Sequence, residues 1–122
     1  LVTTHLPLAK VPGAVTKAKV ATATFWLGAF MAEMAGVDRA RAPAPVAVAG
    51  LNPHAGERGL LGHEETRIIA KGMDLAAKRL ARAKVAVELR GPVPAESAFR
   101  LAKDGVFSAV VAMYKLPLAL VA

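Results

Sequence analysis

The strongest constraint on the fold is residues 46–51, a short run that contains no polar side chain and leads directly into a glycine-rich turn. This composition is typical of a strand in a parallel sheet, because helices cover both faces of such a sheet and neither face meets water. Residues 85–89 and 106–114 predict two further strands. Residues 63–83 repeat apolar side chains every three or four positions, which predicts an amphipathic helix between the first two strands.

Two more helices are predicted, over residues 14–35 and 94–102. The second begins at Pro94, which suits a first turn because an N–H group there would have no partner within the helix. Alternating strands and helices predict an α/β fold with a mostly parallel sheet flanked by helices. A chain of 122 residues fits a single α/β segment, residues 1–122. The core-facing positions are predicted to be Val20, Thr24, Leu27, Phe30 or Met31, and Met34 in the first helix, and Ile69, Met73, Ala76, Leu80 and Ala83 in the second.

Sheets of this kind bind ligands beyond the carboxyl ends of their strands. Residues 1–4 are interpreted as a further strand end, and His5 follows them directly. His54 follows the first buried strand after a short turn, and the loop at residues 91–96 and Tyr114 follow the other two. We therefore expect these side chains at one edge of the sheet.

Composition excludes several classes of protein. The chain contains no cysteine, which rules out disulfides and iron–sulfur clusters and leaves only His and carboxylates as metal ligands. A cysteine-free chain suits a reducing compartment, and we expect a cytoplasmic protein. The longest apolar runs, residues 20–32 and 106–114, are shorter than the ~18 residues of a membrane-spanning helix. The chain also lacks an initiating Met and a secretory signal, so we expect a piece of a longer polypeptide.

The net charge of +7 admits anionic partners such as phosphates, nucleotides or nucleic acid. The densest basic run, residues 78–84, alternates with apolar positions along one predicted helix. Such a pattern is typical of a solvated helix face, and few aromatic side chains are interleaved with the basic ones, as they often are in nucleic-acid binders. We therefore expect neither a nucleic acid nor a membrane as partner.

Common catalytic motifs are missing. Gly56, Gly59 and Gly62 are spaced three apart, unlike the dinucleotide-binding G-x-G-x-x-G, and no P-loop lysine follows. Neither serine lies in a G-x-S-x-G turn, which excludes the usual serine hydrolase. Glu64 and Glu65 open the predicted helix, where its dipole favours negative charge.

Two histidines remain as candidate metal ligands, His5 and His54. A neutral imidazole binds divalent metals at roughly 2.0–2.1 Å, and a catalytic site normally supplies three protein ligands. Spacing alone slightly favours the alternative interpretation, two loop histidines with local hydrogen bonds. Glu57, three residues after His54, either orients that imidazole or moves a proton, or else caps its own loop.

The segment Gly-Leu-Asn-Pro-His-Ala-Gly-Glu at residues 50–57 closely resembles the 4-hydroxythreonine-4-phosphate dehydrogenase family of vitamin B6 (pyridoxal phosphate) biosynthesis. Further segments match in the same order along the chain. They are residues 3–8, Gly62 with Glu64 and Glu65, residues 91–95 with Phe99, and residues 112–114. The resemblance covers nearly the whole chain but only the middle of the family's much longer chain.

The resemblance implies the fold of isocitrate and isopropylmalate dehydrogenases, here incomplete. It also implies that His5 and His54 are two of three histidines that hold a divalent metal (Zn²⁺, Mg²⁺ or Co²⁺), with Glu57 as a catalytic residue in support. The family's third histidine directly follows Ala-Met-Tyr. Lys115 occupies that position here, so we expect this segment alone to be inactive.

The implied reaction is NAD-dependent oxidation of the secondary alcohol of 4-phosphooxy-L-threonine, followed by decarboxylation of the β-keto acid. A metal acting as a Lewis acid suits both steps. The family's homodimer implies a subunit interface, for which Phe25, Trp26 and Phe30 are candidates, although core packing explains them equally well. The alternative function is a non-catalytic α/β module that uses its basic surface to bind phosphorylated ligands or a partner chain.

Overall fold

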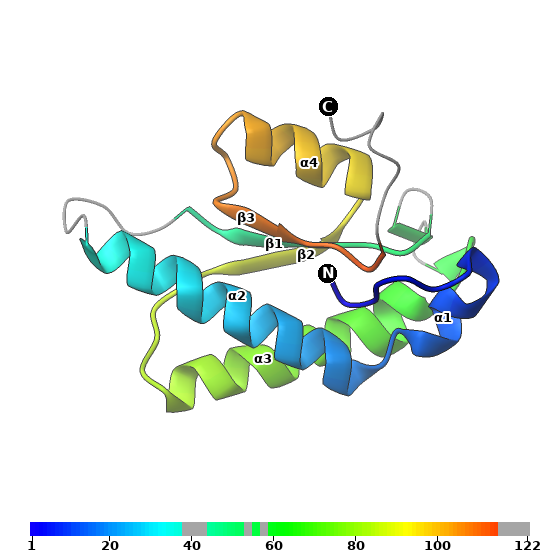
Figure 1. Cartoon of the computed structure of the whole chain (residues 1–122), viewed down its shortest axis with the longest axis horizontal. Helices are drawn as coiled ribbons and strands as arrows, with labels where there is room; N and C mark the ends of the chain where they lie inside the picture. Colours follow the sequence, from blue (N-terminus) through cyan, green and yellow to red (C-terminus); the bar gives the residue numbers. More distant parts are fainter. Residues whose placement is uncertain (38–43, 53–54, 57–58, 115–122) are drawn as a thin grey trace.

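The computed structural model describes residues 1–37, 44–52, 55–56 and 59–114. Its elements are, in order, η1 (Leu8–Lys10), α1 (Val11–Ala14), α2 (Lys17–Val37), β1 (Val46–Ala49), η3 (Glu65–Ile69), α3 (Ala70–Arg82), β2 (Leu89–Val93), α4 (Ala95–Lys103) and β3 (Ala109–Val111). Within this part of the chain the strands form one parallel sheet in the order β2-β1-β3 (Figure 1). The predicted α/β class with a parallel sheet and flanking helices is confirmed.

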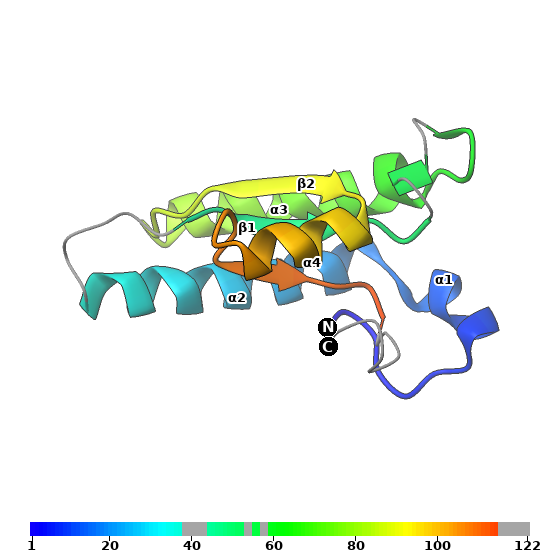
Figure 2. The ribbon, with the colours of Figure 1, turned by 90° about the horizontal axis from the view of Figure 1, so that it is seen from above.

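The sheet lies between two helical layers, with α2 and α3 on one face and α4 on the other (Figures 1 and 2). The sequence of β1 explains this, because alternate residues of a strand point to opposite faces. Val46 and Val48 pack into the core on the α2 and α3 side. Ala47 and Ala49 contact the α4 side, where their small side chains let that helix approach closely. All four are buried, as the sequence predicted.

Helices α2 and α3 pack against each other through small residues. A Cβ atom added at Gly72 would lie 2.7 Å from Cβ of Val20, so only glycine fits this contact without a shift. Phe25 of α2 packs nearby with Leu80 of α3. Of the predicted α3 face, Ile69, Met73, Ala76 and Leu80 are buried, whereas Ala83 follows the helix and is exposed, so that part of the prediction is wrong.

The first predicted helix, residues 14–35, is interrupted. Val15 is extended and buried between α1 and α2. Thr16 then accepts a hydrogen bond from the backbone N–H of Lys19 at 3.2 Å and so caps the start of α2. The apolar periodicity continues across this break and therefore did not reveal it. Of the alternatives Phe30 and Met31, Met31 packs against the core, whereas Phe30 is more than half exposed. The predicted burial of Met34 is wrong, because its side chain is also more than half exposed.

The second strand begins later than predicted. Residues 85–89 were expected to pair, but β2 (Leu89–Val93) carries the ladder and includes part of the predicted 91–96 loop. The alternation of Val85, Val87 and Leu89 instead reflects one-sided packing against the cluster formed by Phe25, Ala76 and Leu80. Among the described strands β2 lies at the edge of the sheet, a position where proline is tolerated, as at Pro92.

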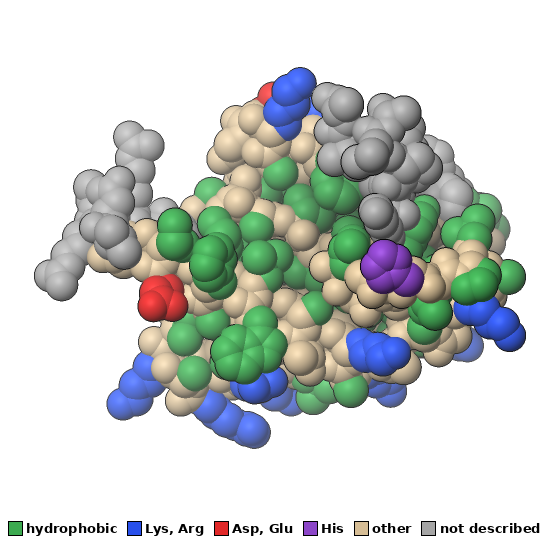
Figure 3. All heavy atoms as spheres, viewed as in Figure 1, with side chains coloured by type: hydrophobic (Ala, Val, Ile, Leu, Met, Phe, Trp, Pro, Cys, Tyr) green, Lys and Arg blue, Asp and Glu red, His purple; other side chains and the backbone are tan. Residues whose placement is uncertain are grey.

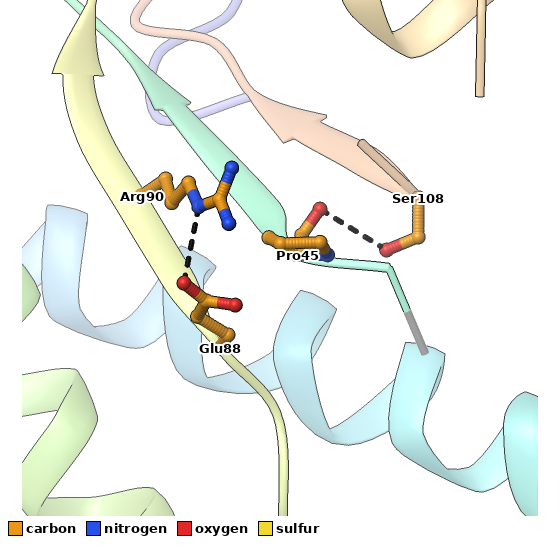
Figure 4. A network of polar contacts seen from close by, with 4 residues as sticks. All are labelled: Pro45, Glu88, Arg90 and Ser108. Atoms are coloured by element: carbon orange, nitrogen blue, oxygen red, sulfur yellow. Dashed lines mark hydrogen bonds and ion pairs between the residues drawn. The ribbon is translucent and has the colours of Figure 1, made fainter. Parts of the chain in front are cut away.

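The third strand is shorter than the predicted range of residues 106–114, since Val106 is exposed and pairing is confined to β3 (Ala109–Val111). Ser108 ties the start of β3 to the start of β1. Its hydroxyl donates to Ala44 O at 2.7 Å, and its N–H donates to Pro45 O at 2.9 Å. Figure 4 shows a longer contact of the same hydroxyl with Pro45 O, at 3.5 Å. The ion pair between Arg90 of β2 and Glu88, which precedes that strand, is exposed and contributes little to stability. No described helix is long and apolar enough to cross a bilayer.

Candidate functional site

The amino-terminal segment runs beside the residues that follow β3. Val2 N–H donates to Ala112 O at 2.8 Å, and Thr3 N–H donates to Met113 O at 3.1 Å. The buried Thr3 hydroxyl donates to Met113 O as well, at 2.7 Å. Residues 1–4, interpreted from the sequence as a strand end, are therefore hydrogen-bonded at the sheet although no strand forms there. The expected location of this segment at the carboxyl edge is confirmed.

His5 follows this anchored segment directly. Its φ of 54° lies in the left-handed region, which few residues other than glycine adopt but where histidine is enriched. The side chain is exposed. An exposed imidazole on a backbone fixed two residues earlier is available to a ligand at the carboxyl edge of the sheet.

A buried carboxylate holds the loop that follows β1. The Glu65 side chain is only 4% exposed. Its Oε1 accepts hydrogen bonds from the N–H groups of Leu51 and Asn52, each at 2.7 Å. Its Oε2 accepts a third from Asn52 Nδ2 at 2.9 Å. Three N–H donors on one ionisable carboxyl group make short, charge-assisted contacts that fix the loop to the start of the next helix.

Sequence reasoning missed this role of Glu65, which was attributed to the helix dipole together with Glu64. Glu64 has contacts of its own, with His63 N–H at 2.9 Å and Asn52 Nδ2 at 3.3 Å. Two adjacent glutamates in a first turn look alike in a sequence. The signal that distinguishes Glu65 is its burial, which only the tertiary structure supplies.

The glycines of the loop make room for this carboxylate. A Cβ atom added at Gly50 would lie 3.0 Å from Glu65 Oε1, and one at Gly56 would lie 2.8 Å from Glu65 Oε2. Gly56 also has a φ of +79°, which disfavours any side chain. Glycines in a loop allow the backbone either to bend sharply or to approach another group closely. At Gly56 it does both.

Two predicted site residues, His54 and Glu57, lie outside the described residues. The backbone on either side of His54 is hydrogen-bonded, with Ala55 N–H donating to Asn52 O at 3.1 Å. Within the described ranges, no three His, Asp or Glu side chains are grouped closely enough to hold a metal ion. Of the proposed ligands, the described structure therefore contributes His5 alone, and the roles of His54 and Glu57 stay predictions.

Two other elements were predicted at this edge, the loop after the second strand and Tyr114. Val93 at the end of β2 accepts a hydrogen bond from Gly50 N–H at 2.8 Å, which joins the second loop to the first. Tyr114 follows β3 and packs half-buried against the main core. The chain segments expected at the carboxyl ends of the strands thus lie at one edge, as far as the structure describes them.

Comparison with known proteins identifies the family. Residues 1–115 match the family model described as pyridoxal phosphate biosynthetic protein PdxA. A 4-hydroxythreonine-4-phosphate dehydrogenase from Xanthomonas campestris pv. campestris is 43% identical over 114 residues, which are 93% of this chain and 32% of that protein. One from Aromatoleum aromaticum is 44% identical over the same shares of the two chains. The chain thus spans about a third of the length of these curated relatives.

Solved structures agree. A crystal structure of 4-hydroxythreonine-4-phosphate dehydrogenase from Klebsiella pneumoniae superposes with a TM-score of 0.67 at 37% identity, covering 93% of this chain and 31% of that one. The enzyme of the same name from Burkholderia phymatum gives a TM-score of 0.70 at 32% identity, with the same coverage. On sequence and fold together, this chain belongs to the pyridoxal phosphate biosynthetic protein PdxA family.

Proposed function

We propose that residues 1–122 are one α/β segment of a 4-hydroxythreonine-4-phosphate dehydrogenase and contribute two metal-binding histidines to its active site. The reaction is oxidation of the secondary alcohol of 4-phosphooxy-L-threonine by NAD, followed by loss of CO₂, in pyridoxal phosphate biosynthesis. The family match and the names of the relatives support this assignment. A small phosphorylated substrate is also compatible with the net charge of +7.

One observation of the structure carries the proposal. Two family segments that are far apart in sequence, residues 3–5 and 50–52, lie at the same edge of one sheet. The first is hydrogen-bonded beside Met113, and the second continues from β1, which pairs in parallel with β3. The carboxyl edge is where open α/β sheets bind their ligands.

In this proposal, His5 and His54 each supply one imidazole nitrogen to a divalent metal (Zn²⁺, Mg²⁺ or Co²⁺). The donor chemistry fits such an ion, and the exposed side chain of His5 is accessible to it. Bound there, the metal would supply Lewis-acid stabilisation of negative charge on the substrate oxygens. Glu57 would orient the His54 ring or move a proton. Because Lys115 replaces the family's third histidine, we expect the 122-residue chain alone to lack dehydrogenase activity.

We further propose a cytoplasmic homodimer. Phe25 is buried in the core, but Trp26 and Phe30 are 61% and 56% exposed, which favours an interface role for these two. Met34 extends the same stripe by another turn of α2. Figure 3 shows hydrophobic side chains gathered over α2, while basic ones line the edge of the molecule along α3. Sedimentation equilibrium would test the proposal, with Trp26→Lys expected to shift a dimer toward monomer.

Calorimetric titration of the chain with Zn²⁺ tests the proposed function. We expect one ion per chain, with affinity reduced by on the order of tenfold, or about 1.4 kcal/mol, in His5→Ala and in His54→Ala. His63→Ala is the matched control, because His63 is the chain's third histidine, is exposed, and has no assigned ligand role.

An unchanged affinity in His54→Ala, or an equal loss in His63→Ala, would contradict the assignment of the ligands. If the wild-type chain bound no metal, and if a longer chain containing it formed no NADH from 4-phosphooxy-L-threonine, the non-catalytic phosphate-binding module would replace the dehydrogenase.

A further inference from the structure

We infer that Glu65 is a positioning residue of the metal site, because its buried carboxylate fixes the backbone that leads into His54. The inference rests on the proposed role of His54 as a ligand. Glu65 itself touches neither metal nor substrate in this proposal. It acts through Leu51 and Asn52, the last described residues before that histidine.

The geometry is specific to one carboxylate. Both N–H groups of consecutive peptides, Leu51 and Asn52, point at a single oxygen, Glu65 Oε1, each at 2.7 Å. The other oxygen, Oε2, accepts from the Asn52 side chain at 2.9 Å. Two adjacent backbone donors and one side-chain donor on the same group fix both the peptide planes and the Asn52 rotamer. A single hydrogen bond would allow the loop to rotate about it.

Simple loop closure does not require this arrangement. Leu51 and Asn52 are only half-buried, so water could satisfy their N–H groups without any protein acceptor. Burying a carboxylate is costly unless several donors compensate for the lost hydration. Here three N–H donors compensate for that lost hydration. Glycine at positions 50 and 56 leaves room for the carboxylate, because a Cβ atom at either position would crowd the Glu65 oxygens. The result is one fixed backbone conformation two residues before His54.

Such fixation matters for a metal ligand. Functional side chains must be held to within about 0.5 Å of their productive positions. Removing groups that orient ligands typically lowers metal affinity by about 10–100-fold. Glu65 also stands at the start of η3, which leads directly into α3. It therefore couples the loop to a helix that is packed against the core through Ile69 and Met73.

The test variant is Glu65→Gln in the 122-residue chain. A glutamine that keeps its oxygen on the two backbone N–H groups must turn its NH₂ toward Asn52 Nδ2, so that donor faces donor. We expect Zn²⁺ affinity to fall about tenfold or more. We also expect faster hydrogen exchange at the Leu51 and Asn52 amides. The matched control is Asp74→Asn, which neutralises an exposed carboxylate of α3 and should change neither quantity.

Zinc titrations are carried out at a temperature where circular dichroism shows every variant to be folded. A purely structural role of Glu65 would lower the melting temperature of the variant but leave the zinc affinity of the folded chain unchanged. If Glu65→Gln does not fold, Glu65→Asp keeps the charge, shortens the side chain and should weaken zinc binding by a smaller factor. The inference would be overturned if the wild-type chain binds zinc and a folded Glu65 variant binds it with the same affinity. That result would leave the proposed function intact. Absence of zinc binding by the wild-type chain would instead refute the proposed function, and this inference with it.

Discussion

In the proposed metal site, Lys115 is the residue at which this chain departs most from the resemblance, which implies a third metal-binding histidine at that position. A third imidazole completes the ligand number that catalytic sites normally use. We therefore expect Lys115→His to tighten Zn²⁺ binding by about tenfold or more, equivalent to about 1.4 kcal/mol. Calorimetric titration measures this, with the exposed Lys103→His of α4 as control. Equal affinities for the wild-type chain and the Lys115 variant would argue against a metal site beside Tyr114.

Single residues differ in how far a sequence reveals them. The edge location of His5 was predictable although the strand expected before it does not form, because Val2 and Thr3 are hydrogen-bonded to the residues that follow β3. The role of Glu65 was not, because its contacts join residues 13 and 14 positions apart across a loop. Patterns of neighbouring residues in the sequence do not predict contacts over such a separation. Gly56 gave a partial signal, since a glycine-rich loop is compatible with a close approach but does not identify the partner.

At the scale of elements, the contact between α2 and α3 depends on Gly72. An alanine there would place its Cβ 2.7 Å from Val20 Cβ and 2.9 Å from Lys17 O. Overpacking of this kind costs about 1–3 kcal/mol, whereas the better helix propensity of alanine returns about 1 kcal/mol. We expect Gly72→Ala to lower the free energy of unfolding by up to about 2 kcal/mol, measured by urea denaturation.

Gly36→Ala provides the matched control. A Cβ atom at Gly36, near the end of α2, would meet no atom within 4 Å. The same substitution should therefore be neutral or stabilise the chain by up to about 1 kcal/mol. If both variants lost stability equally, the close approach of α2 and α3 would not be the cause.

Elements were predictable where one physical cause dominated. Strand β1 is buried on both faces, so its composition alone indicated it. Strand β2 was misplaced because alternating burial occurs both in a paired strand and in an extended segment packed on one side, as at Val85 and Val87. The break before α2 was missed because the spacing of apolar residues contains no information about the Thr16 side chain, which caps the helix.

For the whole molecule, the α/β class followed from the alternation of elements, and the family followed from motifs in register. The site followed only in part. Its segments come from both ends of the chain and meet through the parallel pairing of β1 and β3 and the hydrogen bonds of Val2 and Thr3. A sequence indicates that such segments share an edge, but the directions of their side chains depend on contacts such as those of Glu65.

The most direct test of the shared metal site is a ¹⁵N–¹H spectrum of the imidazole rings, because the chain has just three histidines, each assignable by substitution. At one equivalent of Zn²⁺, the account predicts that the ring signals of His5 and His54 move together to metal-bound positions while those of His63 stay unchanged. Independent shifts of His5 and His54 at different zinc concentrations, or a shift of His63 with either one, would contradict a common metal ion at this edge of the sheet.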